Sequence, residues 1–428
     1  MQIIQNESLS AIKNKIRQAT EQTVDSVVVE RVDQIIAKVR ENGDQALKDY
    51  SQSLDGVSLD DFLVDQAIID QAYNQLDVGV RQALQAAAEN IKSFHQRERA
   101  ESFEDRTVAG VVRGTKVTPL ARVGIYVPGG TAAYPSSVLM NAIPAKVAGV
   151  QEVIMVTPPQ ADGLNPAVLA AAKIAGIDRI YQIGGAQAVA ALAYGTETVP
   201  QVDKITGPGN AYVAAAKRAV YGQVDIDMIA GPSEIGILAD EDADPQALAA
   251  DLLSQAEHDV NARAILITNS LSLAQEVSEA VECQLLTLPR QKIARQAIDH
   301  NGFIYLVETI DEMIALMNEV APEHLEIQLK NPDSYLDRIE NAGSVFLGKY
   351  TSEPLGDYFA GPNHILPTGG TARFSSPLGV WDFQKHIQYL SYDQMALQRD
   401  ADAVIALANV EGLEGHARAI ESRGTVND

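Results

Sequence analysis

The chain has 428 residues and carries 33 Lys and Arg against 57 Asp and Glu, which gives a formal net charge of −24. An acidic chain without clusters of Lys and Arg is not expected to bind nucleic acid or an anionic membrane surface. Its length fits about two or three domains, and 46% apolar residues are enough to form their cores. The single cysteine, Cys283, excludes a disulfide framework and fits a cytoplasmic protein.

Residues 1–99 show apolar side chains spaced by about 3.6 positions, which predicts helices joined by short turns. These helices are expected at 24–41, 65–75 and 79–99. The stretch 123–145 is uncharged and long enough to span a bilayer, but it contains several prolines and glycines. It therefore predicts a strand, a turn and a buried helix, and no membrane association.

After residue 110, short β-branched runs alternate with Ala-rich stretches of helical length. Such alternation is typical of a parallel sheet with helices on both faces. One series of strands is expected at 123–127, 153–156, 179–183 and 226–229, and a second at 235–238, 264–268, 303–306 and 344–347. The two series predict an α/β fold with two Rossmann-like lobes and a cleft between them. The residues from 383 onward look helical and polar, without a strand pattern.

Gln255 and His258 lie at the end of an expected helix that starts with Asp244 as its cap and Pro245 in its first turn. They are three positions apart, so they share one face of the helix and suit two ligands of one metal ion. A capped surface helix whose last histidine interacts with the helix dipole explains the same residues.

Glu323 and His324 follow Pro322, where a helix must end and a strand is expected to begin. A carboxylate beside an imidazole offers two proton acceptors whose unperturbed pKa values are about 4.3 and 6.5. This pair suits a reaction with two distinct deprotonations. A surface turn that carries both residues by accident remains the alternative.

Asp357 follows a glycine in a Gly- and Pro-rich segment that ends at His364, and its carboxylate suits a divalent cation. Glu411 and His416 each lie next to a glycine in the polar tail, where a frayed terminal helix is the alternative. Gln255, His258, Asp357 and His416 would form a set of oxygen and nitrogen ligands without a thiolate, as in a catalytic zinc site. Spacing alone does not show that these four residues meet.

Three glycine motifs precede expected helices and present backbone N–H groups that suit a phosphate. They are Val127-Pro-Gly-Gly130, Gly184-Gly-Ala-Gln187 and Gly207-Pro-Gly-Asn210. None completes the Gly-x-Gly-x-x-Gly pattern of dinucleotide-binding folds. Ordinary chain reversals between strand and helix explain them equally well.

Eight motifs in this order make the chain resemble histidinol dehydrogenase along nearly its whole length. They are Gly124-Ile-Tyr-Val-Pro-Gly-Gly130, Gly184-Gly-Ala-Gln187, Thr206-Gly-Pro-Gly-Asn210, Ala230-Gly-Pro-Ser-Glu234, Asp251-Leu-Leu-Ser-Gln-Ala-Glu-His258, Ala321-Pro-Glu-His-Leu325, Gly356-Asp-Tyr358 and Gly361-Pro-Asn-His364. Glu411-Gly-Leu413 and His416 add to the match. The resemblance implies a cytoplasmic homodimer that uses one zinc ion per subunit and oxidises L-histidinol to L-histidine in two NAD-linked steps.

The resemblance also assigns roles to residues at matching positions. The expected zinc ligands are Gln255, His258, Asp357 and His416. The expected substrate contacts are Ser233, Gln255, His258, His324, Asp357, Glu411 and His416. The expected NAD contacts are Tyr126, Gln187 and Asn210. Glu411 and His416 are expected to act in the neighbouring subunit's site, so that the two active sites are shared.

The resemblance further implies that His324 removes protons in both oxidations and that Glu323 activates the water that attacks the aldehyde. We expect a helical segment at 1–24, a first lobe built from 25–125 and 234–380, a second lobe at 126–233, and a helical tail at 381–428. Two other interpretations stay open at this point. One is an NAD-dependent paralogue that acts on another amino alcohol or a sulfonate, and the other is a non-catalytic ligand-binding protein with two lobes.

Overall fold

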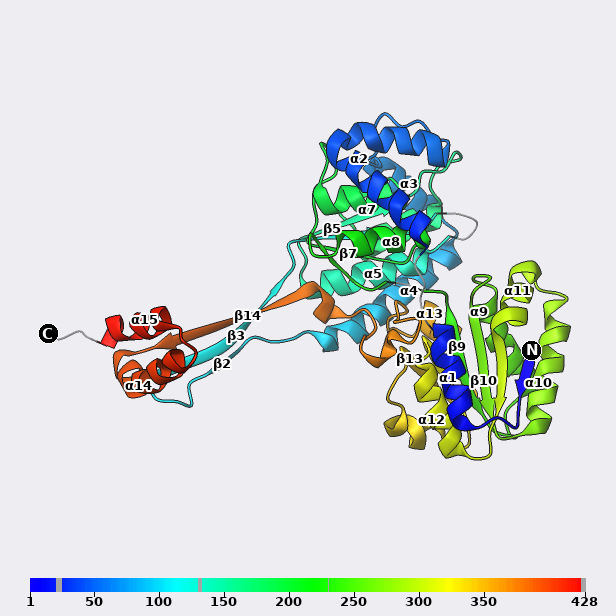
Figure 1. Cartoon of the computed structure of the whole chain (residues 1–428). Coiled ribbons are helices and arrows are strands. Elements are labelled where there is room, and N and C mark those ends of the chain that lie inside the picture. Colours follow the sequence, from blue (N-terminus) through cyan, green and yellow to red (C-terminus); the bar gives the residue numbers. More distant parts are fainter. Residues whose placement is uncertain (21–24, 130–132, 230, 425–428) are drawn as a thin grey trace. The chain divides into compact units, whose positions relative to one another are not determined.

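The computed structural model describes residues 1–20, 25–129, 133–229 and 231–424. It divides into a larger unit, residues 1–98 with 121–383, and a smaller unit, residues 99–120 with 384–428. The larger unit contains two parallel sheets of six and five strands, which confirms the predicted α/β fold (Figure 1). None of the described helices combines the length and the apolar composition that crossing a bilayer requires.

The six-stranded sheet is parallel throughout and is covered by helices on both faces. Its strands, in spatial order, are β1 (Gln2–Ile4), β11 (Gly302–Leu306), β10 (Arg263–Thr268), β9 (Glu234–Ala239), β12 (His324–Gln328) and β13 (Ser344–Leu347). Its helices are α1 (Leu9–Thr20), α9 (Pro245–Ala256), α10 (Leu271–Leu285), α11 (Gln291–Asn301) and α12 (Ile310–Val320). On β9, Ile237 packs toward α9 while Leu238 packs toward α12, because successive side chains point to opposite faces. Both faces of this strand are therefore buried.

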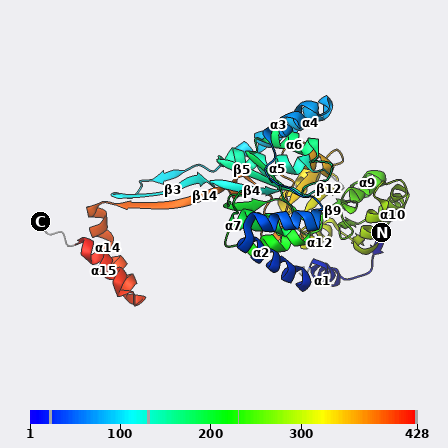
Figure 2. The same ribbon diagram turned by 90° about the horizontal axis from the view of Figure 1, so that it is seen from above.

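The five-stranded sheet is also parallel and lies between two groups of helices (Figure 2). Its strands, in spatial order, are β6 (Arg179–Gln182), β5 (Glu152–Thr157), β4 (Arg122–Tyr126), β7 (Lys204–Thr206) and β8 (Asp225–Ile226). One group of helices is α2 (Ser26–Tyr50), α7 (Gly185–Tyr194) and α8 (Ala211–Val220), and the other is α3 (Gln66–Gln75), α4 (Val78–His95), α5 (Pro135–Ala148) and α6 (Pro166–Ala175). The strand β7 was not predicted, and β8 is shorter than expected.

The grouping of the N-terminal residues differs from the expected one. The segment 25–125 was expected beside 234–380, but α2 packs on α7 and α8, while α3 and α4 pack on α6 and α5. The apolar face of α2, with Ile35 and Val39, joins the same core as Val189. Residues 1–20 are not only helical, because β1 forms an edge strand of the six-stranded sheet and α1 packs on α12.

Helix α2 is longer than predicted because it continues past Gly43, whose φ of 50° kinks the helix. Val24, the expected first residue, lies outside the described residues. After α2 comes the short helical turn η1 (Ser51–Asp55), which ends at Gly56 in the left-handed conformation, with a φ of 71°. Other short helical elements of the larger unit are η2 (Gln96–Glu98), η3 (Pro332–Arg338), α13 (Glu353–Tyr358), η4 (Thr371–Arg373) and η5 (Val380–Phe383).

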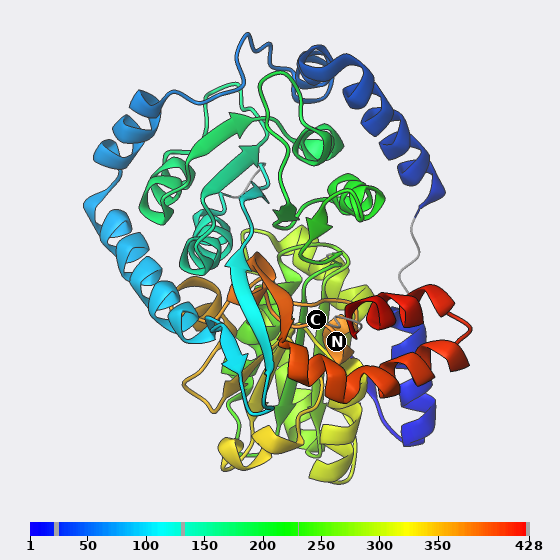
Figure 3. The same ribbon diagram turned by 90° about the vertical axis from the view of Figure 1, so that its left-hand side faces the viewer.

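The smaller unit consists of an antiparallel sheet and two helices, as Figures 1 and 3 show. Its strands, in spatial order, are β14 (Gln384–Tyr392), β3 (Val111–Pro119) and β2 (Phe103–Asp105), and its helices are α14 (Gln394–Val410) and α15 (Glu414–Gly424). The expectation of a tail without a strand is wrong, because β14 pairs with β3 along its whole length. Nearly all of β14 is exposed, so it lacks the alternation of buried and exposed residues that marks a strand in a sequence.

Candidate active site

The topology gathers the chemically active residues of the six-stranded lobe at one edge of its sheet. Ser233 precedes β9 and His324 begins β12, so both lie at the N-terminal edge of these parallel strands. Helix α9 runs back against the strands, and its end brings Gln255 and His258 to the same edge. Sequence-distant residues therefore meet because the connection between two parallel strands runs from the C-terminal edge of the sheet back to the N-terminal edge, where the first strand began.

The five-stranded lobe contributes the opposite edge of its sheet. Tyr126 ends β4, and a turn from Gly207 to Asn210 links β7 to α8. Gly207 has a φ of 108°, and a Cβ at this position would collide with the carbonyl of Tyr126. Only glycine fits there, so the motif Gly207-Pro-Gly-Asn210 serves a close approach of two backbones.

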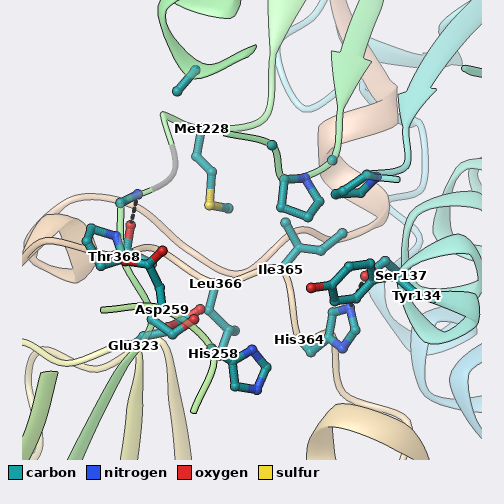
Figure 4. A pocket seen from close by; sticks show the side chains of 18 of the residues that line it. Tyr134, Ser137, Met228, His258, Asp259, Glu323, His364, Ile365, Leu366 and Thr368 are labelled. Carbon is teal, nitrogen blue, oxygen red and sulfur yellow. Dashed lines mark hydrogen bonds between the residues drawn. The ribbon is translucent and has the colours of Figure 1, made fainter. Parts of the chain in front are cut away.

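A cavity of about 590 Å³ lies between these two edges (Figure 4). Seven residues predicted from the sequence line it, namely Asn210, Ser233, Gln255, His258, Glu323, His324 and Asp357. Figure 4 shows His258 and Glu323 on one side of the cavity and Tyr134 and Ser137 beside His364 on another. The structure thus brings together most of the predicted site, although it assigns no role to any member.

His324 is oriented by its backbone neighbour and offers one free nitrogen. The side chain is only 3% exposed, and its Nδ1 lies 3.0 Å from the carbonyl oxygen of Glu234. Because a carbonyl only accepts, Nδ1 carries the proton and donates it there. In neutral His324, Nε2 is therefore the unprotonated nitrogen, and it has no hydrogen-bond partner among the described residues. This is the arrangement that a general base requires.

The electrostatic surroundings of His324 favour its protonated form. Nε2 lies 3.4 Å from Oδ1 of Asp357 and 3.9 Å from Oε1 of Glu353, and Nδ1 lies 3.7 Å from Oε2 of Glu323. Burial lowers the pKa of His324, but the negative charges of these carboxylates outweigh it and raise the pKa to about 10. A cation bound by Asp357 would offset part of this negative charge and bring the base closer to its working range.

Glu323 is held beside His324 by the start of β9. Its Oε2 accepts a hydrogen bond from the backbone N–H of Glu234 at 2.9 Å. Burial raises the pKa of Glu323 to about 7, and the positive charge of His324 and the hydrogen bond counteract this only in part. A carboxylate with a pKa near neutrality is a stronger base than an ordinary glutamate and still ionises at physiological pH.

Glu353 belongs to this cluster and was missed in the sequence. It is 2% exposed, and ligand atoms of His324, Glu353 and Asp357 lie within 4.8 Å of one another. Glu353 and Asp357 are four residues apart in α13, a spacing that places both side chains on one face of a helix. This spacing could have identified Glu353 from the sequence, but a six-residue helix is too short to show helical periodicity.

The cluster fits a divalent cation on the chemistry of its own atoms. Among the described residues, Glu353 and Asp357 form ion pairs with histidines only. Nε2 of His324 is buried beside both carboxylates and has no hydrogen-bond partner in the described part of the chain. Burial, followed by the charge of Asp357, raises the pKa of Glu353 to about 8. Buried carboxylates without an Arg or Lys partner fit a cation as their counter-charge.

A second layer of carboxylates holds α13 in place. Asp251 accepts a hydrogen bond from Oγ of Ser352 at 2.7 Å, and Glu326 accepts one from the N–H of Glu353 at 2.9 Å. Burial, followed by the charge of Asp251, raises the pKa of Glu326 to about 8. The two residues fix the start of the helix that carries Glu353 and Asp357.

His364 is a further residue of the cavity that sequence reasoning mentioned without giving it a role. Its Nδ1 lies 2.9 Å from the carbonyl oxygen of Asp357, and its Nε2 lies 3.3 Å from Oγ of Ser137. The ring therefore connects α13 with α5, and so links the two lobes on one side of the cavity. Burial lowers the pKa of His364, which favours its neutral form.

A second cavity, of about 840 Å³, contains all three residues predicted to bind NAD. Tyr126 and Gln187 are buried in its wall, and Asn210 borders both this cavity and the first. The hydroxyl of Tyr126 accepts a hydrogen bond from the N–H of Gly185 at 3.0 Å. Oδ1 of Asn210 caps α8 by accepting from the N–H groups of Tyr212 and Val213.

The remaining predicted residues lie elsewhere in the chain. Glu411 directly follows α14 and His416 belongs to α15, so both are part of the smaller unit, where both are exposed. Gly130 and Ala230, which belong to two of the sequence motifs, lie outside the described residues.

The fold and this site define a class of protein. Two parallel-sheet lobes enclose a cavity with a carboxylate–imidazole pair and a cluster suited to a divalent cation, which is the architecture of a metal-assisted α/β enzyme. The family model for histidinol dehydrogenase matches residues 17–424. The chain belongs to the histidinol dehydrogenase family.

Individual relatives agree with the family match. The chain is 64% identical over 423 residues to a histidinol dehydrogenase of Lactiplantibacillus plantarum, covering 99% of both chains. It is 56% identical to one of Listeria monocytogenes, covering 98% of this chain and 97% of the relative. The crystal structure of histidinol dehydrogenase from Elizabethkingia anophelis matches with a TM-score of 0.94 at 38% identity, covering 99% of this chain and 98% of that one.

Proposed function

We propose that this protein oxidises L-histidinol to L-histidine through L-histidinal, with two molecules of NAD reduced, as the last step of histidine biosynthesis in the cytoplasm. The observation that carries the proposal is the buried pair of Glu323 and His324, with Nε2 of His324 free, in the cavity that also contains Gln255, His258 and Asp357. The family to which the chain belongs indicates the substrate. The cavity contains the acid–base groups that oxidation of this substrate needs.

In the first oxidation, Nε2 of His324 accepts the proton of the substrate hydroxyl while the carbinol carbon loses a hydride. The hydrogen bond from Nδ1 to the carbonyl of Glu234 keeps the ring in the tautomer that can accept this proton. NAD, when bound, accepts the hydride. The products of this step are the aldehyde, one NADH and one proton.

In the second oxidation, Glu323 accepts a proton from the water that attacks the aldehyde carbon. His324 then accepts the proton of the resulting hydrate as the second hydride leaves to a second NAD. Two bases with different surroundings suit these two tasks, because burial places the pKa of Glu323 at about 7. The enclosing cavity keeps the aldehyde from diffusing away between the steps.

Gln255, His258 and Asp357, together with the partner subunit's His416, would hold the zinc ion. Bound there, zinc would fix the imidazole and amine of the substrate and so orient the carbinol carbon. Ser233 and Glu411 complete the proposed substrate contacts. Tyr126, Gln187 and Asn210 would bind NAD, as their common cavity supports.

Glu326, which accepts a hydrogen bond from the start of α13, allows a test of the zinc site that does not depend on turnover. We expect Glu326→Leu to lower the affinity for zinc about 10- to 100-fold, because the helix that carries Asp357 loses the acceptor at its start. Glu326→Gln keeps an acceptor and should lose much less. Zinc affinity is measured by competition with a chelator, and unchanged affinity of the leucine variant would contradict the role given to Glu326.

We further propose a homodimer that shares its active sites, with the six-stranded lobe binding substrate and the five-stranded lobe binding NAD. The smaller unit exposes large apolar side chains, with exposed fractions of 87% for Val410, 77% for Met395, 67% for Leu407 and 65% for Leu390. Several large exposed apolar side chains within one small unit are typical of a surface that another protein covers. Met395, Leu407 and Val410 belong to α14, Glu411 directly follows this helix and His416 lies in α15, which supports their transfer to a partner's site.

Mixing two inactive variants tests the shared site. His324→Asn and His416→Asn are each expected to be inactive, because each removes one essential group from both sites of its homodimer. After subunits are exchanged at equal amounts, half of the dimers are mixed and each has one intact site, so about a quarter of wild-type activity returns. A mixture that stays inactive after verified exchange would show that each site uses residues of one chain only.

The proposed reaction is tested by absorbance of NADH with histidinol and NAD. We expect activity that disappears after zinc is removed by a chelator and returns when zinc is added back. Another amino alcohol that is oxidised as efficiently as histidinol would point to the paralogue. Absence of NADH with fully zinc-loaded protein would refute the enzymatic proposal.

A further inference from the structure

The cavity with the predicted NAD residues contains a carboxylate to which nothing so far gives a role. Asp55, the last residue of η1, lines this cavity with Tyr126 and Gln187. Its Oδ2 is buried and has no hydrogen-bond partner in the described part of the chain. Burial raises the pKa of Asp55, and no cation counteracts it. An unsatisfied buried carboxylate oxygen is costly, so its retention calls for a ligand that donates to it.

A second unsatisfied atom in the same cavity is also an acceptor. Oε1 of Gln187 is buried and without a partner among the described residues. Asp55 and Tyr126 line the same cavity, and the charge of Asp55 contributes, after burial, to raising the pKa of Tyr126 to about 12. The wall therefore presents two free acceptors, and the part of a ligand that faces it must carry donors such as hydroxyl groups.

The arrangement of the two cavities indicates which part of NAD this is. Pro128 and Asn210 line both cavities, whereas Asp55 lines only the second and His324 only the first. The nicotinamide must lie in the first cavity, near the carbinol carbon and His324. An extended dinucleotide that passes Pro128 and Asn210 then places its adenosine half beside Asp55.

We propose that Asp55 accepts hydrogen bonds from the ribose hydroxyls of the adenosine half of NAD and thereby selects NAD over NADP. The inference rests on the proposed use of NAD and adds the residue that determines its specificity. A carboxylate that binds a ribose diol repels a phosphate at the 2′ position, since both are anionic and the phosphate carries no donor. In proteins with the usual dinucleotide fingerprint, an acidic residue binds this ribose. This chain lacks the fingerprint, and Asp55 takes the role of that residue.

Arg31 is the residue of this cavity that would favour NADP over NAD. Its Nη1 donates to the hydroxyl of Tyr212 at 3.4 Å, and it is the only Lys or Arg among the described residues that line this cavity. Arginine beside the adenosine ribose is the usual way to accommodate a 2′-phosphate. If Arg31, and not Asp55, faced that ribose, the wild-type protein would bind NADP at least as well as NAD.

The test compares Asp55→Asn with Asp60→Asn, an exposed aspartate in the loop that follows η1. Calorimetry measures the binding of NAD and of NADP to each zinc-loaded protein without turnover, and steady-state kinetics gives KM for both cofactors. We expect Asp55→Asn to weaken NAD binding about 10- to 100-fold and to narrow the gap between NAD and NADP at least about tenfold. KM for histidinol and the melting temperature should match those of Asp60→Asn.

Two results would overturn the inference: NAD affinity of Asp55→Asn equal to that of the control, or a wild-type protein that binds NADP as tightly as NAD. A misfolded variant would also lose zinc and histidinol binding, which separates a folding defect from a specific one. If wild-type protein binds NAD in a manner that depends on Asp55 but does not oxidise histidinol, the proposed function fails and this inference stands.

Discussion

Replacing His324 by asparagine is expected to lower the rate of both oxidations about 10²- to 10⁴-fold, the contribution that a positioned general base typically makes. In neutral His324, Nε2 is the unprotonated nitrogen of a buried ring whose Nδ1 donates to the carbonyl of Glu234. The same nitrogen takes the hydroxyl proton of the alcohol and of the hydrate, so both half-reactions should decline together. The measurement is single-turnover formation of NADH, started with histidinol or with histidinal.

The matched control for this variant is His300→Asn. His300 lies in α11 and is exposed, and Nδ1 of its ring lies 2.9 Å from the carbonyl oxygen of Gln296 in the same helix. It should retain wild-type rates with both substrates. The role of His324 would be contradicted if a folded, zinc-loaded His324→Asn kept more than about a tenth of the wild-type rate in either step, since a smaller loss is below the usual effect of a general base.

Glu323→Gln is expected to separate the two oxidations. Glutamine keeps an oxygen that can accept from the N–H of Glu234, so the start of β9 stays in place, but it cannot take a proton from water. Oxidation of added histidinal should fall about 10²- to 10⁴-fold, while oxidation of histidinol to the aldehyde continues at a rate near that of wild type. Rapid mixing with histidinol should then show a burst of one NADH per site followed by a slow phase.

Glu241→Gln, which changes an exposed glutamate in the turn before α9, serves as the control and should show no burst. Equal loss of both half-reactions in Glu323→Gln would contradict the division of labour. It would mean that Glu323 acts mainly by setting the charge around His324, which lies 3.7 Å away.

The α/β fold could be predicted because most of its parallel strands are short β-branched runs that alternate with apolar stretches of helical length. The strand β5, for example, is buried at five consecutive positions, and the first four of these, residues 153–156, are apolar. The grouping of elements into lobes could not be predicted in the same way. The apolar face of α2 shows that the helix packs on something, but not which of the two sheets it covers.

The site was predictable in part, because some of its residues are spaced as one helix face requires. Gln255 and His258 have this spacing, although α9 ends at Ala256 and His258 lies in the turn that follows it. Glu353 and Asp357 have it in a helix too short to be recognised. Asp55 had no such signal, because its importance comes from an unsatisfied oxygen in a cavity formed by residues far away in the sequence. Contacts of this kind depend on the tertiary structure and leave no periodic pattern.

The central claim, that one site carries out both oxidations, is tested most directly by the amount of NADH formed from a limiting amount of histidinol with excess NAD. The account predicts two NADH and one histidine for each histidinol, with no free aldehyde trapped by an added amine reagent. One NADH for each histidinol, with histidinal as the trapped product, would contradict it and leave a simple alcohol dehydrogenase.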